Sequence, residues 1–570
     1  MTDTLTGYPR AKGWFAALGL ILILAGAWLA ASIQTSGGIS VRDIRFAGTN
    51  GTTMSALLYV PRGATAATPA PGILAVHGYI NSRETQDGFA IEFARRGYVV
   101  LAIDQTGHGY SGGKAFSNGF GGPDGLTYLR SLPMVDKGQI GLEGHSMGGW
   151  TVLAAAAAMP DAYRSIVLEG SSTGAPYAKD GSPAWPRNLA LVYSLYDEFS
   201  GLMWDSPRAM DLAGSVKLQG VFGSGGAIEP GKLYGSIDAG TARVLYQPAT
   251  THPGDHISPA AIGHATDWFA RTLKGGTPLP ASDQLWYWKE VGTGIGLAGF
   301  VLLILGTFDL LLRSTPFRGL QAAAIPAVAE RDTRWRRGMW LTTLVPVLLF
   351  FPTFIAIFLL LPATMVLPQT VTTQVALWAL LCAGAGVLLR RFGPVPAPTP
   401  SSPWLAAVGI AVATVAVGYL AVFLVDRLFT TDLRLWILAV KWPSAWQWNI
   451  ASIYLVPITI AYLVILRGVN GLMVQGDSAG RHYRTAITAM AGAFAGVFVL
   501  VYAGFFVTGT LVTGFDPLST VIALQFVAIL PVIAVIATFA WRRTGSHRAG
   551  ALIVGLLVTL YVCAGTATQG

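Results

Sequence analysis

The stretch GHSMG at residues 144–148 decides the fold of the first half of the chain. It follows a short apolar run at 140–142 and opens an Ala-rich stretch that extends to residue 159. A serine flanked in this way, after a strand and before a helix, is typical of a sharp turn that exposes the hydroxyl above a sheet. The pattern predicts that Ser146 is a nucleophile and that the amide of Met147 faces the same site.

On both sides of this turn, short β-type runs alternate with helical stretches between Gly37 and Asp283. Such alternation predicts an α/β domain with a mostly parallel sheet and helices on both faces. The expected strands are SALLYV (55–60), GILAVHG (72–78), YVVLAID (98–104), IGLEG (140–144), SIVLEG (165–170), LQGVFG (218–223) and RVLYQP (243–248). The expected helices cover residues 87–96, 122–131 and 149–159.

The remainder of the chain has the composition of a membrane protein. Of the 570 residues, 52% are hydrophobic and only 12% are charged, whereas soluble domains carry about 25% charged residues. Residues 14–33 are long enough to cross a bilayer, so residues 1–36 are expected to form an uncleaved anchor rather than a signal peptide. Residues 284–570 are expected to form an all-α domain with spans near 291–312, 338–361, 370–389, 403–425, 449–466, 485–508, 519–540 and 549–565.

The net charge of +9 does not indicate nucleic-acid binding, because the arginines gather in short loops between apolar runs. This distribution follows the positive-inside rule. If Arg10 and Lys12 are cytoplasmic, the α/β domain lies on the extracytoplasmic side of the cell membrane. The mixed segment 432–442 is expected to be a short interfacial helix. The two cysteines lie in apolar runs and imply no disulfide. No metal-ligand spacing is present, and no cofactor is implied.

Three motifs stand in chain order: HGY (77–79), DQTGHGYSG (104–112) and GHSMGG (144–149). Together they resemble the α/β-hydrolase superfamily, especially its dienelactone-hydrolase-like and serine-aminopeptidase-like members. The resemblance implies an oxyanion hole made by the amides of Tyr79 and Met147. It also implies that Asp104 and His108 have a structural role rather than a chemical one.

The same resemblance narrows the choice of base and acid. The family's chain order is serine, acid, histidine. Of the histidines at 252, 256 and 264, His256 in GDHISP best matches the family position. The position of the usual acid, within 223–230, holds a glycine, which leaves Glu169 and Glu229 as alternative acids.

An aromatic insertion at 176–215 is expected to be a helical cap near the site. It could act as an apolar lid, pack against its own core or touch the membrane interface.

These features predict a membrane-embedded serine hydrolase of the esterase/lipase type, acting on a small-molecule, lipid or acyl ester. The alternatives are an acyltransferase or peptidase with the same site, or a transporter or channel with a degenerate hydrolase domain. The span centres are nearly free of ionisable residues, which disfavours ion-coupled transport. The bundle is expected to offer a lateral groove that delivers a membrane-resident substrate to Ser146. The sequence does not indicate an oligomeric state.

Overall fold

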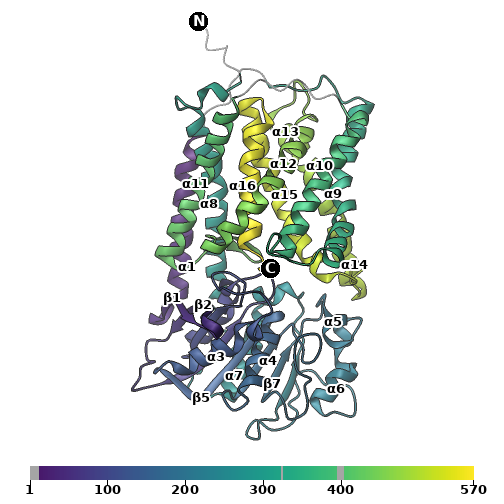
Figure 1. The fold of residues 1–570 in the computed structure, drawn as a ribbon. Helices are drawn as coiled ribbons and strands as arrows, with labels where there is room; N and C mark the ends of the chain where they lie inside the picture. The colour runs from purple at the N-terminus through teal and green to yellow at the C-terminus, as the bar shows by residue number, and fades with distance from the viewer. Residues whose placement is uncertain (1–11, 323–324, 395–402) are drawn as a thin grey trace.

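The computed structural model describes residues 12–322, 325–394 and 403–570, so Arg10 lies outside the described residues. A domain built on a β-sheet lies against one end of a bundle of long helices (Figure 1). The described chain begins at the far end of the bundle, and residues near 570 lie at the junction between the two parts.

The sheet has eight strands in the order β1-β2-β4-β3-β5-β6-β7-β8. β1 and β2 pair antiparallel, as do β2 and β4, and every other pair is parallel. β3, β4, β6, β7 and β8 are buried along nearly their whole length, and β5 is buried from Ile140 to its end, so these segments read as apolar runs rather than alternating ones. The strands are β1 (Ser40–Ala47), β2 (Thr53–Val60), β3 (Ala70–Val76), β4 (Val99–Asp104), β5 (Val135–His145), β6 (Ser165–Glu169), β7 (Leu189–Val192) and β8 (Arg243–Tyr246).

Helices cover both faces of this sheet, as the strand–helix alternation predicted. α3 (Gly122–Ser131) and α4 (Met147–Ala158) pack on one face, and their apolar residues share one core with the sheet. α2 (Asp87–Arg95) and α7 (Pro259–Thr272) cover the other face around a second core. The α/β-hydrolase fold expected from the motifs is confirmed by this topology.

One expected strand is wrong. LQGVFG lies in helix α6 (Val216–Phe222), which Ser215 caps by accepting a hydrogen bond from the Leu218 amide at 3.3 Å. Gly223 ends the helix with a φ of +65°, a conformation that favours glycine. The buried residues Leu218, Val221 and Phe222 have helical spacing. A short apolar run does not by itself separate a buried strand from a buried helix.

Residues 176–215, expected to be a helical cap, contain the sheet strand β7. Only their second half is helical, in α5 (Ser200–Trp204) and the short 3₁₀ helix Ala209–Gly214. The strand was missed because its apolar run, LALV, stands inside an aromatic segment. Because β7 belongs to the sheet, the loop that begins at Tyr193 lies at the edge of the sheet where the other parallel strands have their carboxyl ends.

Nine helices of the described residues are long and apolar enough to cross a membrane, in agreement with the expected multi-pass protein. Each overlaps an expected span. They are α1 (Trp14–Gln34), α8 (Trp286–Leu312), α9 (Thr333–Leu360), α10 (Thr370–Leu389), α11 (Trp404–Phe429), α12 (Ala445–Asn470), α13 (Ala479–Ile487) continued by α14 (Ala493–Thr508), α15 (Pro517–Thr544) and α16 (His547–Ala564). The segment 432–442 is not a helix but a hairpin, β9 (Leu433–Leu435) with β10 (Leu438–Val440).

α1 packs along α8 through facing glycines. A Cβ atom at Gly26 would lie 2.3 Å from the Gly292 carbonyl, and one at Gly19 would lie 2.6 Å from the Gly299 carbonyl. Small residues let helix backbones approach closely in a bilayer, where van der Waals packing holds spans together. The facing glycines therefore let α1 and α8 pack in close contact.

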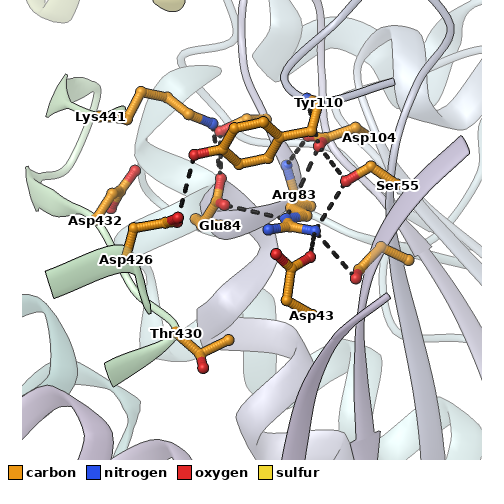
Figure 2. A network of polar contacts seen from close by, with 12 residues as sticks. Asp43, Ser55, Arg83, Glu84, Asp104, Tyr110, Asp426, Thr430, Asp432 and Lys441 are labelled. Atoms are coloured by element: carbon orange, nitrogen blue, oxygen red, sulfur yellow. Dashed lines mark hydrogen bonds and ion pairs between the residues drawn. The ribbon is translucent and has the colours of Figure 1, made fainter. Parts of the chain in front are cut away.

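A buried ionic network fastens the sheet domain to the bundle (Figure 2). Arg83, which precedes α2, is only 1% exposed and bonds Asp43 of β1 and Ser55 of β2. Its neighbour Glu84 accepts from Lys441, which follows β10, at 3.0 Å. Burial by itself would raise the pKa of Glu84, but the charges of Lys441 and Arg83 outweigh it and hold that pKa well below its usual range.

Further contacts extend this junction along the hairpin and the neighbouring spans. The Tyr110 hydroxyl donates to the Trp442 carbonyl at 2.9 Å. Arg434 donates to the Thr85 hydroxyl at 2.9 Å. Lys289, near the start of α8, pairs with Asp87 at the start of α2. The junction therefore joins α2 and the segment before it to two separate parts of the helical domain.

Candidate active site

Ser146 occupies the strained turn that the motif predicts. β5 ends at His145, α4 begins at Met147, and Ser146 between them has φ 56° and ψ −122°. Such a conformation is costly for a residue with a side chain and is found at functional sites. The neighbouring glycines are required because a side chain would clash with the backbone. A Cβ atom on Gly144 would lie 2.2 Å from the Gly148 carbonyl oxygen, and a Cβ atom on Gly148 would lie 2.1 Å from the Val76 carbonyl oxygen.

His252, rather than His256, has an acid partner. Its Nδ1 lies 2.8 Å from Oδ2 of Asp197, and both side chains are buried. Asp197 also accepts at Oδ1 from the Phe199 amide at 2.8 Å and from the Tyr193 hydroxyl at 3.2 Å. Burial lowers the pKa of His252, but the charge and hydrogen bond of Asp197 outweigh it, so that pKa is raised.

The backbone after β7 and β8 brings this pair together. The Leu195 amide donates to the Pro248 carbonyl at 2.9 Å, and the Tyr196 amide donates to the Thr250 carbonyl at 3.0 Å. Asp197 and His252 follow directly on these two bonded segments. Gly170, at the end of β6, leaves room for the pair, since a Cβ there would lie 2.9 Å from the His252 Nδ1.

His256 lines the same cavity as Ser146 but lacks a partner. Neither of its ring nitrogens has a hydrogen-bond partner among the described residues. Its ring packs on that of His145, with centroids 4.0 Å apart. Burial, together with the charge of His252, lowers the pKa of His256 to about 3, so it is neutral at ordinary pH.

Neither of the two expected acids bonds either histidine among the described residues. Glu169 ends β6 with both carboxylate oxygens buried and without partners among the described residues. Burial, then the nearby Asp255 and Glu143, raise the pKa of Glu169 far above its usual range. Glu229 is a surface residue, 69% exposed, and pairs with Lys232 at 3.0 Å. Neither glutamate contacts His252 in any hydrogen bond or ion pair of the described residues.

The loop after β3 holds Tyr79, whose amide is the other expected oxyanion donor. The Gly78 carbonyl is 2.7 Å from Nδ1 of His77, whose Nε2 accepts from the Gln105 amide at 3.1 Å. The C=O and N–H of a trans peptide point in opposite directions, so the Tyr79 amide points away from His77. Gly78 lies against the nucleophile, since a Cβ there would be 3.1 Å from Ser146 Cβ. The amide of Met147, in the first turn of α4, is not used within its own helix.

Asp104 and His108 make contacts away from the cavity, in keeping with the structural role that the resemblance implies. Asp104 accepts from the Ser55 hydroxyl, the Arg83 amide and the Tyr110 amide at 2.9–3.0 Å. The Nδ1 of His108 bonds the Thr106 carbonyl at 3.0 Å. Neither residue lines the cavity beside Ser146.

Ser146 and His252 open into a cavity of about 770 Å³ that both parts of the protein line. The sheet domain contributes Tyr79, Met147 and an aromatic wall in which Tyr177 stacks on Phe116. The bundle contributes residues near the adjoining ends of α9, α10 and α15. The volume lies within the range of small-molecule sites, about 300–1,000 Å³.

Glu198 connects the site to a membrane helix and was not anticipated from the sequence. One carboxylate oxygen accepts from the His252 backbone amide at 2.8 Å, and the other accepts from the Tyr502 hydroxyl of α14 at 2.9 Å. Burial, then the charge of Asp197, raises the pKa of Glu198 to about 7. On the other side of the same loop, the Trp436 indole donates to the Pro253 carbonyl at 2.6 Å.

The family model that matches this chain covers only the first part of this site. Residues 67–196 match the family model described as serine aminopeptidase, S33. A monoacylglycerol lipase of Mycolicibacterium smegmatis is 32% identical over 117 residues, which are 19% of this chain and 40% of that lipase. The chain therefore spans less than half the length of this curated relative.

Solved structures were also compared. The α/β hydrolase GrgF from Penicillium sp. sh18 is 24% identical over 24% of this chain and 49% of its own, with a TM-score of 0.21. A dienelactone hydrolase from Anabaena variabilis is 19% identical over 41% of this chain and 99% of its own, with a TM-score of 0.28. The family match includes the Ser146 motif but stops before Asp197, so the pairing of Asp197 with His252 rests on geometry.

Proposed function

We propose that the protein is a membrane-embedded serine hydrolase that cleaves a carboxylic ester with the triad Ser146, His252 and Asp197. The observation that carries this proposal is the buried 2.8 Å contact between His252 and Asp197 at the rim of the cavity that holds Ser146. The three residues follow β5, β7 and β8 in the order serine, acid, histidine. His252 replaces His256 as the proposed base, and Asp197 replaces Glu169 and Glu229 as the proposed acid.

The proposed reaction proceeds through an acyl-enzyme. The Ser146 oxygen attacks the ester carbonyl while His252 takes the serine proton. The amides of Tyr79 and Met147 hold the oxyanion, an arrangement in which one donor is worth about 10²–10³ in rate. The C–O bond then breaks, and the alcohol leaves with the proton from His252. Water, deprotonated by His252, attacks the acyl-enzyme and releases the carboxylic acid and Ser146.

The presence of an acid beside His252 disfavours the alternative of a degenerate hydrolase domain. That alternative rested on the glycine at the expected acid position. Asp197 fills the role from the loop after β7, and it holds its position through three hydrogen bonds. Acyl transfer to an alcohol or cleavage of an amide would use the same residues, and no feature of the cavity favours either over ester hydrolysis.

We further propose that the sheet domain faces the extracytoplasmic side. Basic residues gather at the end of the bundle far from the sheet, as the positive-inside rule requires for a cytoplasmic face. They are Lys12, Arg313, Arg318, Arg331, Arg334, Arg336, Arg337, Arg390, Arg391, Arg467, Arg481, Arg484, Arg542, Arg543 and Arg548. The basic residues of the bundle near the sheet are fewer, chiefly Lys289, Arg427, Arg434 and Lys441.

The triad is tested by labelling the full-length protein with a short fluorophosphonate probe. Ser146→Ala is expected to abolish labelling, and His252→Ala is expected to slow it by about 10²–10⁴-fold, the usual contribution of a general base. His256→Ala is the matched control, since it removes a second histidine from the same cavity, and it is expected to label at nearly the wild-type rate. Loss of labelling in His256→Ala with retention in His252→Ala would return His256 to the role of base.

The pH dependence tests the role of Asp197. Only neutral His252 accepts the serine proton, and its pKa is raised, so labelling is expected to fall as pH drops through a value above that of an ordinary histidine. Asp197→Asn removes the charge that raises this pKa. The acidic limb is then expected to move to lower pH, and the plateau rate is expected to fall by on the order of 10⁴.

The charges of Glu198 and Asp255 also raise the pKa of His252. Asp238→Asn, on an exposed loop, is the control and is expected to change neither the limb nor the plateau. An acidic limb that stays in place in Asp197→Asn but disappears in Glu198→Gln would assign the titration to Glu198 instead.

The orientation is tested with single cysteines in intact cells. A membrane-impermeant maleimide is expected to label Asp238→Cys in the sheet domain without permeabilisation. Glu330→Cys, which is exposed at the opposite end of the bundle, is expected to react only after permeabilisation. The two native cysteines are buried and give a low background. The reverse labelling pattern would place the hydrolase in the cytoplasm.

A further inference from the structure

The cavity beside Ser146 continues from the sheet domain into the end of the bundle. On the bundle side its walls include Ile355 of α9, Val371 of α10 and Leu518 of α15. The lining reaches Gln525, seven residues beyond Leu518 in the same helix. At 1.5 Å per residue this is a depth of roughly 10 Å along the span. One end of the cavity thus carries the nucleophile, and the other is formed by membrane helices.

Three apolar residues indicate where the cavity opens. Phe358 and Leu359 near the end of α9 and Phe515 before α15 line the cavity, yet they are 69%, 69% and 68% exposed. Side chains that face both the cavity and the outer surface of a membrane bundle mark a lateral opening. Met365 and Val366, in the loop that follows α9, are also exposed apolar residues beside it. Such a patch is stable against hydrocarbon and costly against water.

The opposite wall of the cavity, near the nucleophile, is aromatic. Trp150 of α4 packs on Tyr177, with ring centroids 5.0 Å apart, and Tyr177 stacks on Phe116. Aromatic rings packed in this way lose little freedom when an apolar chain lies against them. Glu198 and Asp516 are the acidic residues that line the cavity, and no Lys or Arg of the described residues lines it, so the lining offers no cation to pair with a carboxylate on the acyl group.

We infer that the bundle half of the cavity is a binding site for the acyl chain of a membrane-resident ester lipid, which enters between α9 and α15. The inference rests on the proposed function and names its substrate class. The ester carbonyl meets Ser146 at the water-accessible side of the bundle, while the chain lies in mostly apolar surroundings whose wall also holds polar side chains such as Gln374 and Gln525. A chain that leaves the bilayer for this site exchanges an apolar environment for one that is mostly apolar.

This assignment also gives the C-terminal spans a role beyond anchoring. A single span would hold the hydrolase at the membrane. The cavity instead needs the ends of α9, α10 and α15 in fixed positions beside Ser146, and that arrangement requires the packed bundle. The long-chain lipid is therefore recognised by the membrane domain and cut by the sheet domain.

The test measures labelling rates of the full-length protein with ethyl, octyl and dodecyl fluorophosphonates, whose alkyl groups stand in for acyl chains. In wild type the rate is expected to rise with chain length, by up to about fourfold per methylene group buried from water. Ile355→Trp fills the bundle half and is expected to reduce dodecyl labelling to near the ethyl rate. Its ethyl labelling is expected to stay within twofold of wild type.

Leu348→Trp is the matched control, because Leu348 lies on the same helix, is 67% exposed and does not line the cavity. It is expected to keep the wild-type dependence on chain length. Leu359→Trp is a second test variant, since that side chain is already exposed and its replacement disturbs little packing. Thermal unfolding in detergent confirms that each variant is folded.

The outcomes separate the two proposals. If the ethyl probe labels Ser146 but chain length has the same effect in Ile355→Trp, Leu359→Trp and Leu348→Trp, the acyl-chain site is overturned and the triad stands. If no probe of any length labels folded wild-type protein, the proposed function itself fails. A loss of ethyl labelling in folded Ile355→Trp and Leu359→Trp would also overturn the acyl-chain site, because it would mean that these positions affect the nucleophile rather than the chain.

Discussion

The buried ionic network at the junction is the constraint on which the rest of the structure depends. Arg83 and Glu84 lie in the sheet domain, and Lys441 and Arg434 lie in the hairpin region of the membrane domain, all of them almost fully buried. Buried ion pairs contribute little net stability, since desolvation offsets their attraction, but removing one partner costs about 3–5 kcal/mol. The network therefore acts mainly to specify one docking position. That position turns the carboxyl ends of the parallel strands, where hydrolase loops carry their chemistry, toward the bundle.

The loops that carry the proposed triad consequently lie between the two domains. The segment that begins at His252 is held by Glu198, which also bonds Tyr502 of α14, and by Trp436, which bonds the Pro253 carbonyl. Residue Thr568, after the last span, exchanges backbone hydrogen bonds with Gly107 and Ala115 of the sheet domain at 2.7–2.8 Å. A rearrangement of the spans would therefore shift the proposed base, because these hydrogen bonds connect its loop to the membrane domain. In most α/β folds such loops face solvent, whereas here a membrane domain forms their second wall.

Most of the fold follows from local patterns, and the site follows from them only in part. The Ser146 turn, the strands β2 to β6 and β8, and the membrane spans were predictable because glycine contacts, buried apolar runs and span length each leave a local signature. Asp197 was missed because LALV at 189–192 was taken as part of a cap and LQGVFG, a capped helix, was taken as a strand. The choice between His252 and His256 depends on the hydrogen bond to Asp197, 55 residues away in sequence. The cavity depends on the docking of two domains, which no local pattern encodes.

The most direct test of this account is an experimental structure of the full-length protein in a lipid environment, with Ser146 bonded to a dodecyl phosphonate. The account predicts that the alkyl chain runs into the bundle between α9 and α15, beside Ile355 and Leu518, with the His252 imidazole next to the Ser146 oxygen and still bonded to Asp197. An alkyl chain directed over the sheet domain away from the spans, or a site in which His256 rather than His252 meets the serine, would contradict it.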